Sequence, residues 1–432
     1  PRRPRRHAGG AARPVGTLLR REAPHDAALH AAVLSRGGDT RLGRPTGKWQ
    51  QPASHVEPLA SGPSRLLPQL EVEQAVQQAA SEDMRPVSMR EVLELVEPHK
   101  MAGFLQMEVP KRMAVRISMI ESLHGWSQVP ELVDLHTQLC EWFQKLRTAK
   151  RSPGGSLRGF TAQVHTIRRG GRRTLGLAAA GMHQLKSAGI YDDAFLDAFL
   201  DNYLLSRIGS NMLMDHYIAC AKQEDGGYGK ATGVIDPHCD ATAICEQVAA
   251  DVAQLCQDCM GSRPEYVVEN YCAGSKGPQD SHCTFSFIPY YLRYILAELM
   301  KNSFRATVKN AANAIDLKAR PVRVLVSRDE FRVAIRVSDR AGGIPFDVGD
   351  RIWSYLYGAA AQGEGGEAPV ATDLAGWGVG LPLSRLHARY LGGRLQVTSF
   401  PGYGTDAYVL LPRIVGDQVE AMPGGVRAGR QG

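Results

Sequence analysis

The sequence predicts a helical bundle followed by a two-layer α/β domain, and three observations support this fold class. Between residues 88 and 222, apolar residues recur at three- and four-residue spacing, as they do in amphipathic helices. Short loops separate these long stretches, which favours a bundle. After Gly261 the pattern changes to short, alternating, β-branched stretches that predict strands. Helix-like stretches flank the strands, and helices on one side of a mixed sheet make a two-layer domain.

The helical part is expected to begin with a short amphipathic helix over residues 70–80. A second helix is expected from Ser88, because Ser88 and Glu91 have the spacing of a capping box, in which each side chain binds a free backbone N–H. The apolar periodicity then predicts four longer helices, over residues 101–123, 129–147, 160–188 and 191–222.

The α/β part is expected to contain two β-hairpins. The first joins residues 322–326 to 331–337, and the second joins 394–399 to 406–411 through a Pro-Gly-Tyr-Gly turn. Helix-like stretches flank or separate the hairpins, over residues 289–309 and 381–390.

Composition divides the chain into four regions. A polar, Gly-rich stretch over residues 223–233 marks the boundary between two domains, expected at 69–232 and 233–413. Residues 1–68 are expected to be irregular, and residues 414–432 form a Gly-rich tail that is expected to be flexible.

The net charge of +7 is concentrated near the beginning of the sequence, where residues 1–49 are rich in Arg and Ala. This composition is typical of a mitochondrial import sequence, although a disordered basic tail or a nucleic-acid-binding arm would share it. With 44% apolar and 22% charged residues, the chain as a whole has the composition expected of an ordinary soluble globular protein. No uninterrupted apolar run reaches about 18 residues, so we expect no membrane insertion.

Cysteine usage gives no strong signal. Cys256 and Cys259 have CxxC spacing, but they lie in a helix-like stretch over residues 241–260 and lack a convincing second pair. We therefore expect these cysteines to pack in the core rather than to form a metal or redox site.

A first polar motif lies on the helix-like stretch over residues 289–309. Glu298, Asn302 and Arg305 stand at i, i+4 and i+7 and share one helix face. A carboxylate, an amide oxygen and a guanidinium on one stripe suit a proton acceptor, a Mg²⁺ ligand and a phosphate partner. The same three residues could also form an ordinary solvated salt-bridge face.

A second motif, from Asp339 to Ile344, directly follows a predicted strand. A buried carboxylate at a strand end can accept the amino group of adenine, and glycines such as Gly343 allow close approach of the backbone to a ligand. A simple strand-to-loop turn would have a similar sequence.

A third motif alternates glycine with apolar residues, at Gly376, Gly378 and Gly380, before a predicted helix. Such a turn offers backbone N–H groups to phosphate at a helix N-terminus. A dinucleotide site would need a strand directly before the glycines, whereas a polar stretch over residues 358–372 precedes them here. A turn over residues 402–405 completes the set.

In this order, the three motifs resemble the N, G1 and G2 boxes of the GHKL ATPase and kinase superfamily. Within it, the chain resembles the mitochondrial 2-oxoacid dehydrogenase kinases, which act on pyruvate or branched-chain 2-oxoacid dehydrogenases. Residues 298–306 resemble their ELxKNxxRA segment. The resemblance extends over residues 86–413 and includes segments at 108–112, 199–213, 235–239, 354–357, 374–382 and 404–408.

This resemblance implies an N-terminal four-helix bundle and a C-terminal Bergerat domain, paired as a homodimer in the mitochondrial matrix. The family transfers the γ-phosphate of MgATP to serine on the E1 subunit of the complex and inactivates it. The lipoyl domain of the E2 core would be a second partner, and no nucleic acid is implied. The segments at 235–239 and 354–357 favour pyruvate dehydrogenase over the branched-chain enzyme.

The resemblance also implies roles for individual residues. Glu298 would be the general base, Asn302 would bind Mg²⁺, and Arg305 would contact the nucleotide. Asp339 would bind adenine, supported by Gly343 and Thr405. The phosphate cradle would comprise Gly376, Trp377, Gly378, Val379, Gly380 and Leu381.

The sequence departs from the family pattern at several positions. Gly171 stands where the family has a histidine beside the base, and Ala341 replaces the first glycine of the second motif. Asn211 replaces an arginine of a regulatory pocket in which Arg207 is retained. The family's Ser-Thr pair is Gly358-Ala359 here, and the tail lacks the Asp-Trp motif of animal pyruvate dehydrogenase kinases.

Three hypotheses follow from these motifs. The first is an active protein serine kinase, and the second is a catalytically impaired, nucleotide-binding regulator of the same complex. The third, a two-component histidine kinase, is disfavoured because His165 and His183 lack the adjacent acidic residue that a phosphoacceptor histidine needs.

Overall fold

The computed structural model describes residues 66–151, 155–222, 233–272, 283–357, 379–413 and 419–423. All of these residues belong to one of the two units into which contacts divide the chain. The predicted import sequence over residues 1–49 lies outside the described residues, as do Gly376, Trp377, Gly378 and the Gly358-Ala359 pair.

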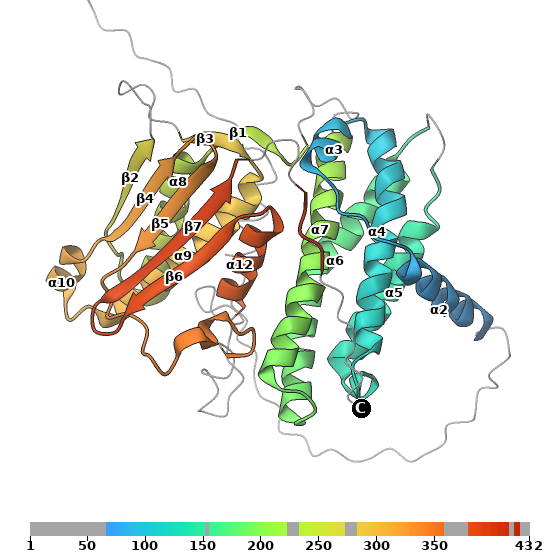
Figure 1. Ribbon diagram of the computed structural model, residues 1–432, viewed down its shortest axis with the longest axis horizontal. Coiled ribbons are helices and arrows are strands. Elements are labelled where there is room, and N and C mark those ends of the chain that lie inside the picture. Colours follow the sequence, from blue (N-terminus) through green and yellow to red (C-terminus); the bar gives the residue numbers. More distant parts are fainter. Residues whose placement is uncertain are drawn as a thin grey trace, which may run out of the picture. The chain divides into compact units, whose positions relative to one another are not determined.

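Helices form the N-terminal part of the described chain (Figure 1). Proline occupies the first turn of two of them, Pro98 and Pro130, where its fixed φ suits the helix and no N–H is needed. The predicted capping box is confirmed: Glu91 N donates to Ser88 Oγ, and Ser88 N donates to Glu91 Oε2 at 3.0 Å. The helices are α2 (Leu66–Ser81), α3 (Met89–Glu94), α4 (Pro98–Glu121), α5 (Pro130–Arg147), α6 (Arg158–Ser187) and α7 (Asp193–Ala221), with a 3-10 turn, η2 (Trp126–Gln128).

The four long helices pack in sequence and close on one another. Helix α4 contacts α5 and α7, and α6 contacts the same two helices. Their facing sides are apolar, with fully buried Leu105, Phe143 and Leu213. Helix α4 breaks this pattern, because Arg112 and Arg116 are also buried. A buried charge requires hydrogen-bonded partners, so these arginines indicate a specific polar contact inside the protein.

A five-stranded sheet of order β2-β4-β5-β7-β6 forms the C-terminal part. Only β2 and β4 pair in parallel; the other neighbours are antiparallel. The strands are β2 (Tyr266–Cys272), β4 (Val322–Arg328), β5 (Arg332–Ser338), β6 (Arg394–Phe400) and β7 (Gly404–Pro412). A separate two-stranded sheet pairs β1 (Asp236–Asp240) with β3 (Thr284–Phe287).

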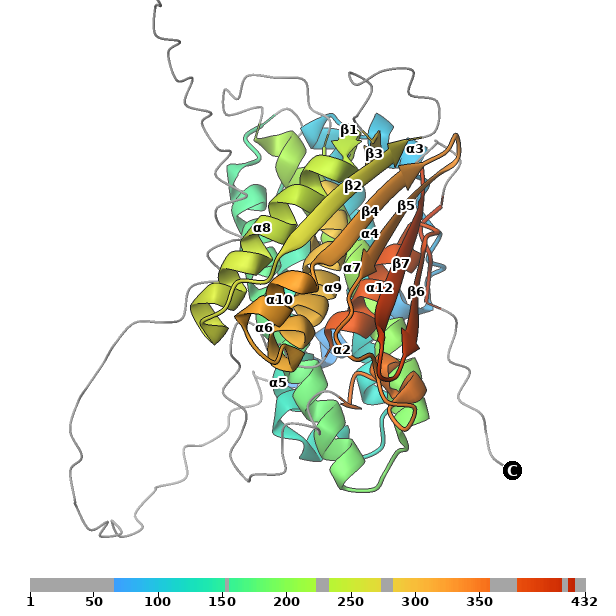
Figure 2. The ribbon, with the colours of Figure 1, turned by 90° about the vertical axis from the view of Figure 1, so that its left-hand side faces the viewer.

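Three helices cover one face of the large sheet (Figure 2). Helix α8 (Ala241–Met260) packs on β2 and β4, α9 (Pro289–Asn310) on β4 and β5, and α12 (Gly380–Tyr390) on β6 and β7. The strands alternate accordingly, with Val324, Ile335 and Val337 buried. Two short elements, α10 (Ala314–Ala319) and the 3-10 turn η3 (Gly349–Trp353), complete this part. The α plus α/β fold class is therefore confirmed.

The predicted long helices and both hairpins are confirmed to within a few residues at their ends. Strand β2 was not predicted, because its parallel partner β4 lies beyond helix α9 and no turn signal links the two. The first described helix begins at Leu66, so the segment expected to be irregular over residues 1–68 overlaps α2. Cys256 is buried as expected, but Cys259 is exposed, so a packing role is wrong for Cys259.

The expectation of a flexible tail over residues 414–432 is wrong for Val419–Pro423. Val419 forms an isolated antiparallel bridge with Ser88, and Glu420 is buried. The glycine content of this region suggested a loose tail, but the side chain of Glu420 has buried partners that local composition does not reveal.

Candidate nucleotide site

Helix α9 carries the first polar motif on its outer face. Its apolar residues, including Leu292, Leu299 and Phe304, are buried. Asn302 is exposed and Arg305 is half-buried, while the side chain of Glu298 is 18% exposed. Lys301 Nζ lies 2.5 Å from Glu298 Oε1. The shared face is therefore confirmed, with one ion pair that the spacing argument did not consider.

Glu298 lies directly against the start of α12. A Cβ built on Gly380 would be 2.3 Å from Glu298 Oε2, so a larger residue here would displace this carboxylate from the helix backbone. Val379 caps α12, Gly380 is its first residue and Leu381 follows, half-buried. The structure thus brings the first motif together with the end of the third.

The first turn of α12 has the properties of an anion-binding site. The first N–H groups of a helix have no intrahelical acceptor, and the helix dipole favours negative charge there. The first helical hydrogen bond runs from Leu383 N to Val379 O, at 3.0 Å. The N–H groups of Gly380 and Leu381 precede it, and Gly380 lies against Glu298.

Asp339 follows β5 and joins the second motif to the last hairpin. Its Oδ1 accepts hydrogen bonds from Ala341 N at 3.1 Å and from Thr405 N at 3.2 Å. Asp339 N in turn donates to Thr405 O at 2.9 Å. Burial raises the pKa of Asp339, and hydrogen bonds from Ser303, Ala341 and Thr405 partly offset this effect. Asp339 and Thr405, predicted separately, therefore form one unit.

Glycines allow the loop and the hairpin to meet. Gly343 has φ +72°, and a Cβ there would lie 2.3 Å from Phe400 O. A Cβ on Gly404 would lie 2.2 Å from Asp339 O. Ala341, the departure from the family pattern, is buried, and its carbonyl accepts a hydrogen bond from Asn310 Nδ2 at 3.1 Å. This loop therefore accommodates alanine.

Helix α9 connects the two halves of the site. Glu298 contacts Gly380, and Ser303 contacts Asp339. These two α9 residues are five positions apart, which corresponds to about 7.5 Å along a helix. A phosphate-binding turn and an adenine-binding carboxylate would thus lie along one helix, with Asn302 on its exposed side.

Helix α7 contacts the chain on both sides of residues 358–378. Asp197 Oδ1 accepts hydrogen bonds from Ser354 Oγ and Tyr355 N, and burial raises the pKa of this carboxyl. Asp201 accepts from Tyr355 Oη at 2.8 Å and forms an ion pair with Arg389 at 3.6 Å. These contacts were not predicted, because they join residues more than 150 positions apart.

Two further departures, Gly171 and Asn211, lie on the neighbouring helices α6 and α7. Arg207 Nη2 donates to Gly171 O at 2.7 Å, and a Cβ on Gly171 would meet no atom within 4 Å. Asn211 is half-buried one turn further along α7. Position 171 therefore has room for a larger residue than glycine.

Two family models match the chain. That of the mitochondrial branched-chain alpha-ketoacid dehydrogenase kinase matches residues 86–236. That of the histidine kinase-, DNA gyrase B-, and HSP90-like ATPase matches residues 289–414, which contain α9, the sheet strands β4 to β7 and α12.

Three similar proteins are all named as mitochondrial pyruvate dehydrogenase kinases. A mitochondrial pyruvate dehydrogenase (acetyl-transferring) kinase of Arabidopsis thaliana is 32% identical over 332 residues, which cover 74% of this chain and 87% of the relative. The human isozyme 4 is 30% identical over 361 residues, with coverage of 78% and 84%. The Ascaris suum enzyme is 32% identical over 269 residues, with coverage of 61% and 65%. The chain therefore belongs to the mitochondrial 2-oxoacid dehydrogenase kinase family and carries the ATP-binding domain of the GHKL superfamily.

Proposed function

We propose that this protein is an ATP-dependent serine kinase that phosphorylates and inactivates the E1 subunit of the mitochondrial pyruvate dehydrogenase complex. The observation that carries the proposal is the contact between Glu298 and Gly380. It sets a carboxylate beside a helix N-terminus suited to phosphate. The names of the relatives support pyruvate dehydrogenase as the target, as do the segments at 235–239 and 354–357.

In the proposed reaction, the serine oxygen of E1 attacks the γ-phosphorus of ATP. A bond forms between that oxygen and phosphorus, the bridging bond to ADP breaks, and Glu298 accepts the serine proton. Gly380, Leu381 and the more N-terminal residues 376–379 would hold the phosphates. Asn302 would hold Mg²⁺, which neutralises phosphate charge during transfer.

The adenine end of the nucleotide would be held by Asp339, Gly343 and Thr405. Asp339 already receives two backbone N–H groups on Oδ1, so its remaining oxygen is the candidate acceptor for the adenine amino group. Arg305, half-buried on the Asn302 face of α9, would add positive charge towards the phosphates.

The alternative of a nucleotide-binding regulator without kinase activity is less well supported. It depends on the departures at Gly171, Ala341 and the Gly358-Ala359 pair. Of these, Ala341 lies in the Asp339 loop with its backbone groups hydrogen-bonded. Glu298, the proton acceptor in the proposal, is retained.

Several finer features belong to the same proposal. We interpret α4 to α7 as a four-helix bundle domain over residues 69–232 and assign residues 233–413 to the kinase domain. The protein would act as a homodimer in the mitochondrial matrix and bind the lipoyl domain of E2. In the described residues no helix is both long and apolar enough to span a membrane.

The test is transfer of labelled γ-phosphate to purified pyruvate and branched-chain E1, measured side by side for the wild type and Glu298→Gln. We expect label on a serine of pyruvate E1 and a loss of about 10²–10⁴-fold in kcat for the variant, because the proton acceptor is lost. Glu330→Gln, an exposed carboxylate in the β4–β5 turn, serves as control and should retain full activity. Equal rates in wild type and Glu298→Gln would refute the assigned mechanism. ATP binding without transfer would favour the regulator.

A further inference from the structure

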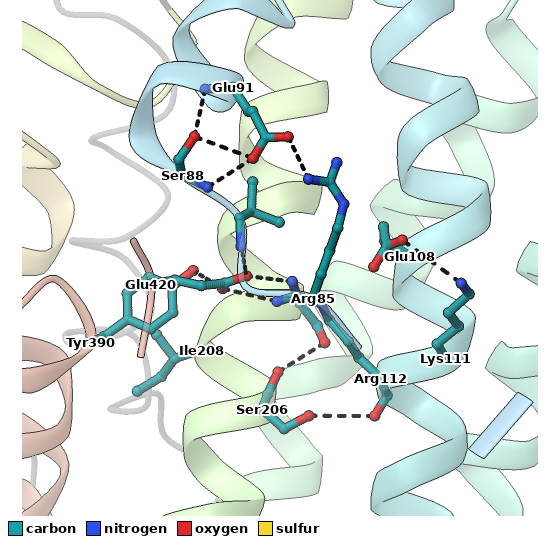
Figure 3. Close-up of polar contacts among 12 residues, drawn as sticks. Arg85, Ser88, Glu91, Glu108, Lys111, Arg112, Ser206, Ile208, Tyr390 and Glu420 are labelled. Atoms are coloured by element: carbon teal, nitrogen blue, oxygen red, sulfur yellow. Dashed lines mark hydrogen bonds and ion pairs between the residues drawn. The ribbon is translucent and has the colours of Figure 1, made fainter. Parts of the chain in front are cut away.

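The segment Val419–Pro423, here called the strap, joins two regions that are distant in sequence (Figure 3). On one side, Val419 bridges to Ser88, and Glu420 N donates to Val87 O at 3.1 Å. On the other, Ala421 N donates to Tyr390 O at 2.9 Å. The strap therefore binds both the chain that leads into α3 and the last residue of α12.

The side chain of Glu420 is the centre of this contact. Its Oε2 accepts from Arg112 Nη1 at 3.0 Å and from Tyr390 Oη at 2.6 Å. Its Oε1 accepts from Arg112 Nη2 at 2.5 Å and from Val87 N at 2.9 Å. The side chains of Arg112 and Glu420 are 1% and 0% exposed. Both carboxylate oxygens are thus satisfied twice, by groups from three parts of the chain.

The backbone of α7 is fitted to this ion pair. A Cβ on Gly209 would lie 2.4 Å from Arg112 Nη1 and 2.9 Å from Glu420 Oε2, so glycine is needed there. One residue earlier, Ile208 O accepts a hydrogen bond from Tyr291 Oη of α9 at 3.2 Å. The rings of Tyr291 and Tyr390 meet edge to face at 6.0 Å. The ion pair therefore lies against elements that also carry the candidate nucleotide site.

Helix α12 links the strap to that site. Tyr390, its last residue, bonds to Glu420, whereas Gly380, its first residue, contacts Glu298. A helix of 11 residues is about 16 Å long and moves as a stiff element. Buried side chains along the helix, among them Leu383 and Leu386, hold it against the rest of the protein.

We propose that Glu420 is a positioning residue, which fixes the C-terminal end of α12 on Arg112 and thereby sets its N-terminal turn against Glu298. This inference rests on the proposed kinase function for its kinetic consequence. Its structural consequence, the order of the first turn of α12, does not depend on activity.

The test uses Tyr390→Phe in the full-length protein, because this change removes only the hydroxyl that α12 gives to Glu420. We expect kcat to fall about tenfold, which corresponds to about 1.4 kcal/mol of activation free energy, while the Kd for ATP from calorimetry rises less than threefold. Backbone amide exchange should accelerate over residues 380–386, at a nearly unchanged Tm. The control is Tyr271→Phe, an exposed tyrosine on β2, which should alter none of these quantities.

A second variant separates positioning from simple stabilisation. In Arg112→Met/Glu420→Leu, both buried charges are removed and the core contact becomes apolar, which often preserves stability. Positioning predicts that Tm recovers relative to Arg112→Met while the fast exchange over residues 380–386 and the low kcat persist. If Tyr390→Phe and the double variant keep the wild-type kcat and exchange at residues 380–386, the proposal is overturned. A wild type that transfers no phosphate would defeat the proposed function alone, because the exchange measurement still decides the role of the strap.

Discussion

The two ends of α12 are built from the same parts but differ in access to solvent. At the first residue, the carboxylate of Glu298 pairs with Lys301 and lies against Gly380. At the last, the carboxylate of Glu420 pairs with Arg112 and lies against Gly209. The first pair is 18% and 13% exposed, whereas the second is almost completely enclosed. A group that exchanges a proton with a substrate must be reachable, while one that fixes a position must be shielded from water.

The largest effect expected from this contrast is the loss of Arg112. The variant Arg112→Met leaves Glu420 as a buried carboxylate without its cation, which should lower the free energy of unfolding by about 3–5 kcal/mol. This decrease can be measured by urea-induced unfolding. Arg323→Met is the matched control, since its ion pair with Glu269 is exposed and should contribute less than about 1 kcal/mol. Equal losses of unfolding free energy in the two variants would mean that the enclosed Arg112–Glu420 pair contributes no more to stability than an exposed ion pair.

A second effect, on pH dependence, comes from His387 in the middle of α12. Burial, aided by the charges of Arg207 and Arg168, lowers the pKa of this histidine from 6.5 to about 4. The unfolded chain therefore binds a proton below pH 6.5 that the folded protein does not. Stability should be complete above pH 6.5 and fall as the pH drops towards 4.

The measured quantity is the free energy of unfolding at pH 7 and pH 5. His387 should account for about 2 kcal/mol of the decrease between these values. In His387→Phe, which keeps a ring between Tyr291 and Tyr294, this part of the decrease should disappear. An unchanged pH dependence in the variant would show that the pKa of His387 is the same in the folded and the unfolded protein.

The smallest effect on stability is expected at the N-terminal end of α12, where Glu298 and Lys301 are partly exposed. In Lys301→Met, Glu298 loses its cation but keeps access to water, so the free energy of unfolding should change by about 1 kcal/mol or less. Measured beside Arg112→Met, this variant sharpens the comparison between the two ends. A loss as large as that of Arg112→Met would make the two ends equivalent.

The sequence predicted the polar residues near the N-terminal end of α12 much better than those at its C-terminal end. Glu298, Asn302 and Arg305 share a helix face because their spacing alone requires it, and burial of the rest of α9 agrees. Asp339 and Thr405 were both proposed, and the pairing of β5 with β7 brings them together, with Ser338 opposite Asp406. Local patterns were sufficient to single out the α9 residues and Asp339, whereas the role of Thr405 was implied by the family resemblance.

The contact between Arg112 and Glu420 could not be predicted from local patterns. Arg112 lies on a helix whose polar residues look solvent-facing, and Glu420 lies among glycines and prolines that suggest a loose tail. Their contact spans 308 positions, and no periodicity or motif connects them. The same holds for Asp197 and Asp201 of α7, which contact residues on both sides of the predicted glycine-rich loop.

The distance along the chain between Arg112 and Glu420 has a consequence for biogenesis. A ribosome completes α4 long before it adds residue 420, and domains generally begin to fold from the N-terminus during synthesis. Until residue 420 emerges, the guanidinium of Arg112 lacks the carboxylate of Glu420. The N-terminal helices therefore cannot reach their final packing around Arg112 before residue 420 has been translated, and a chain that stops earlier would leave this guanidinium without its carboxylate.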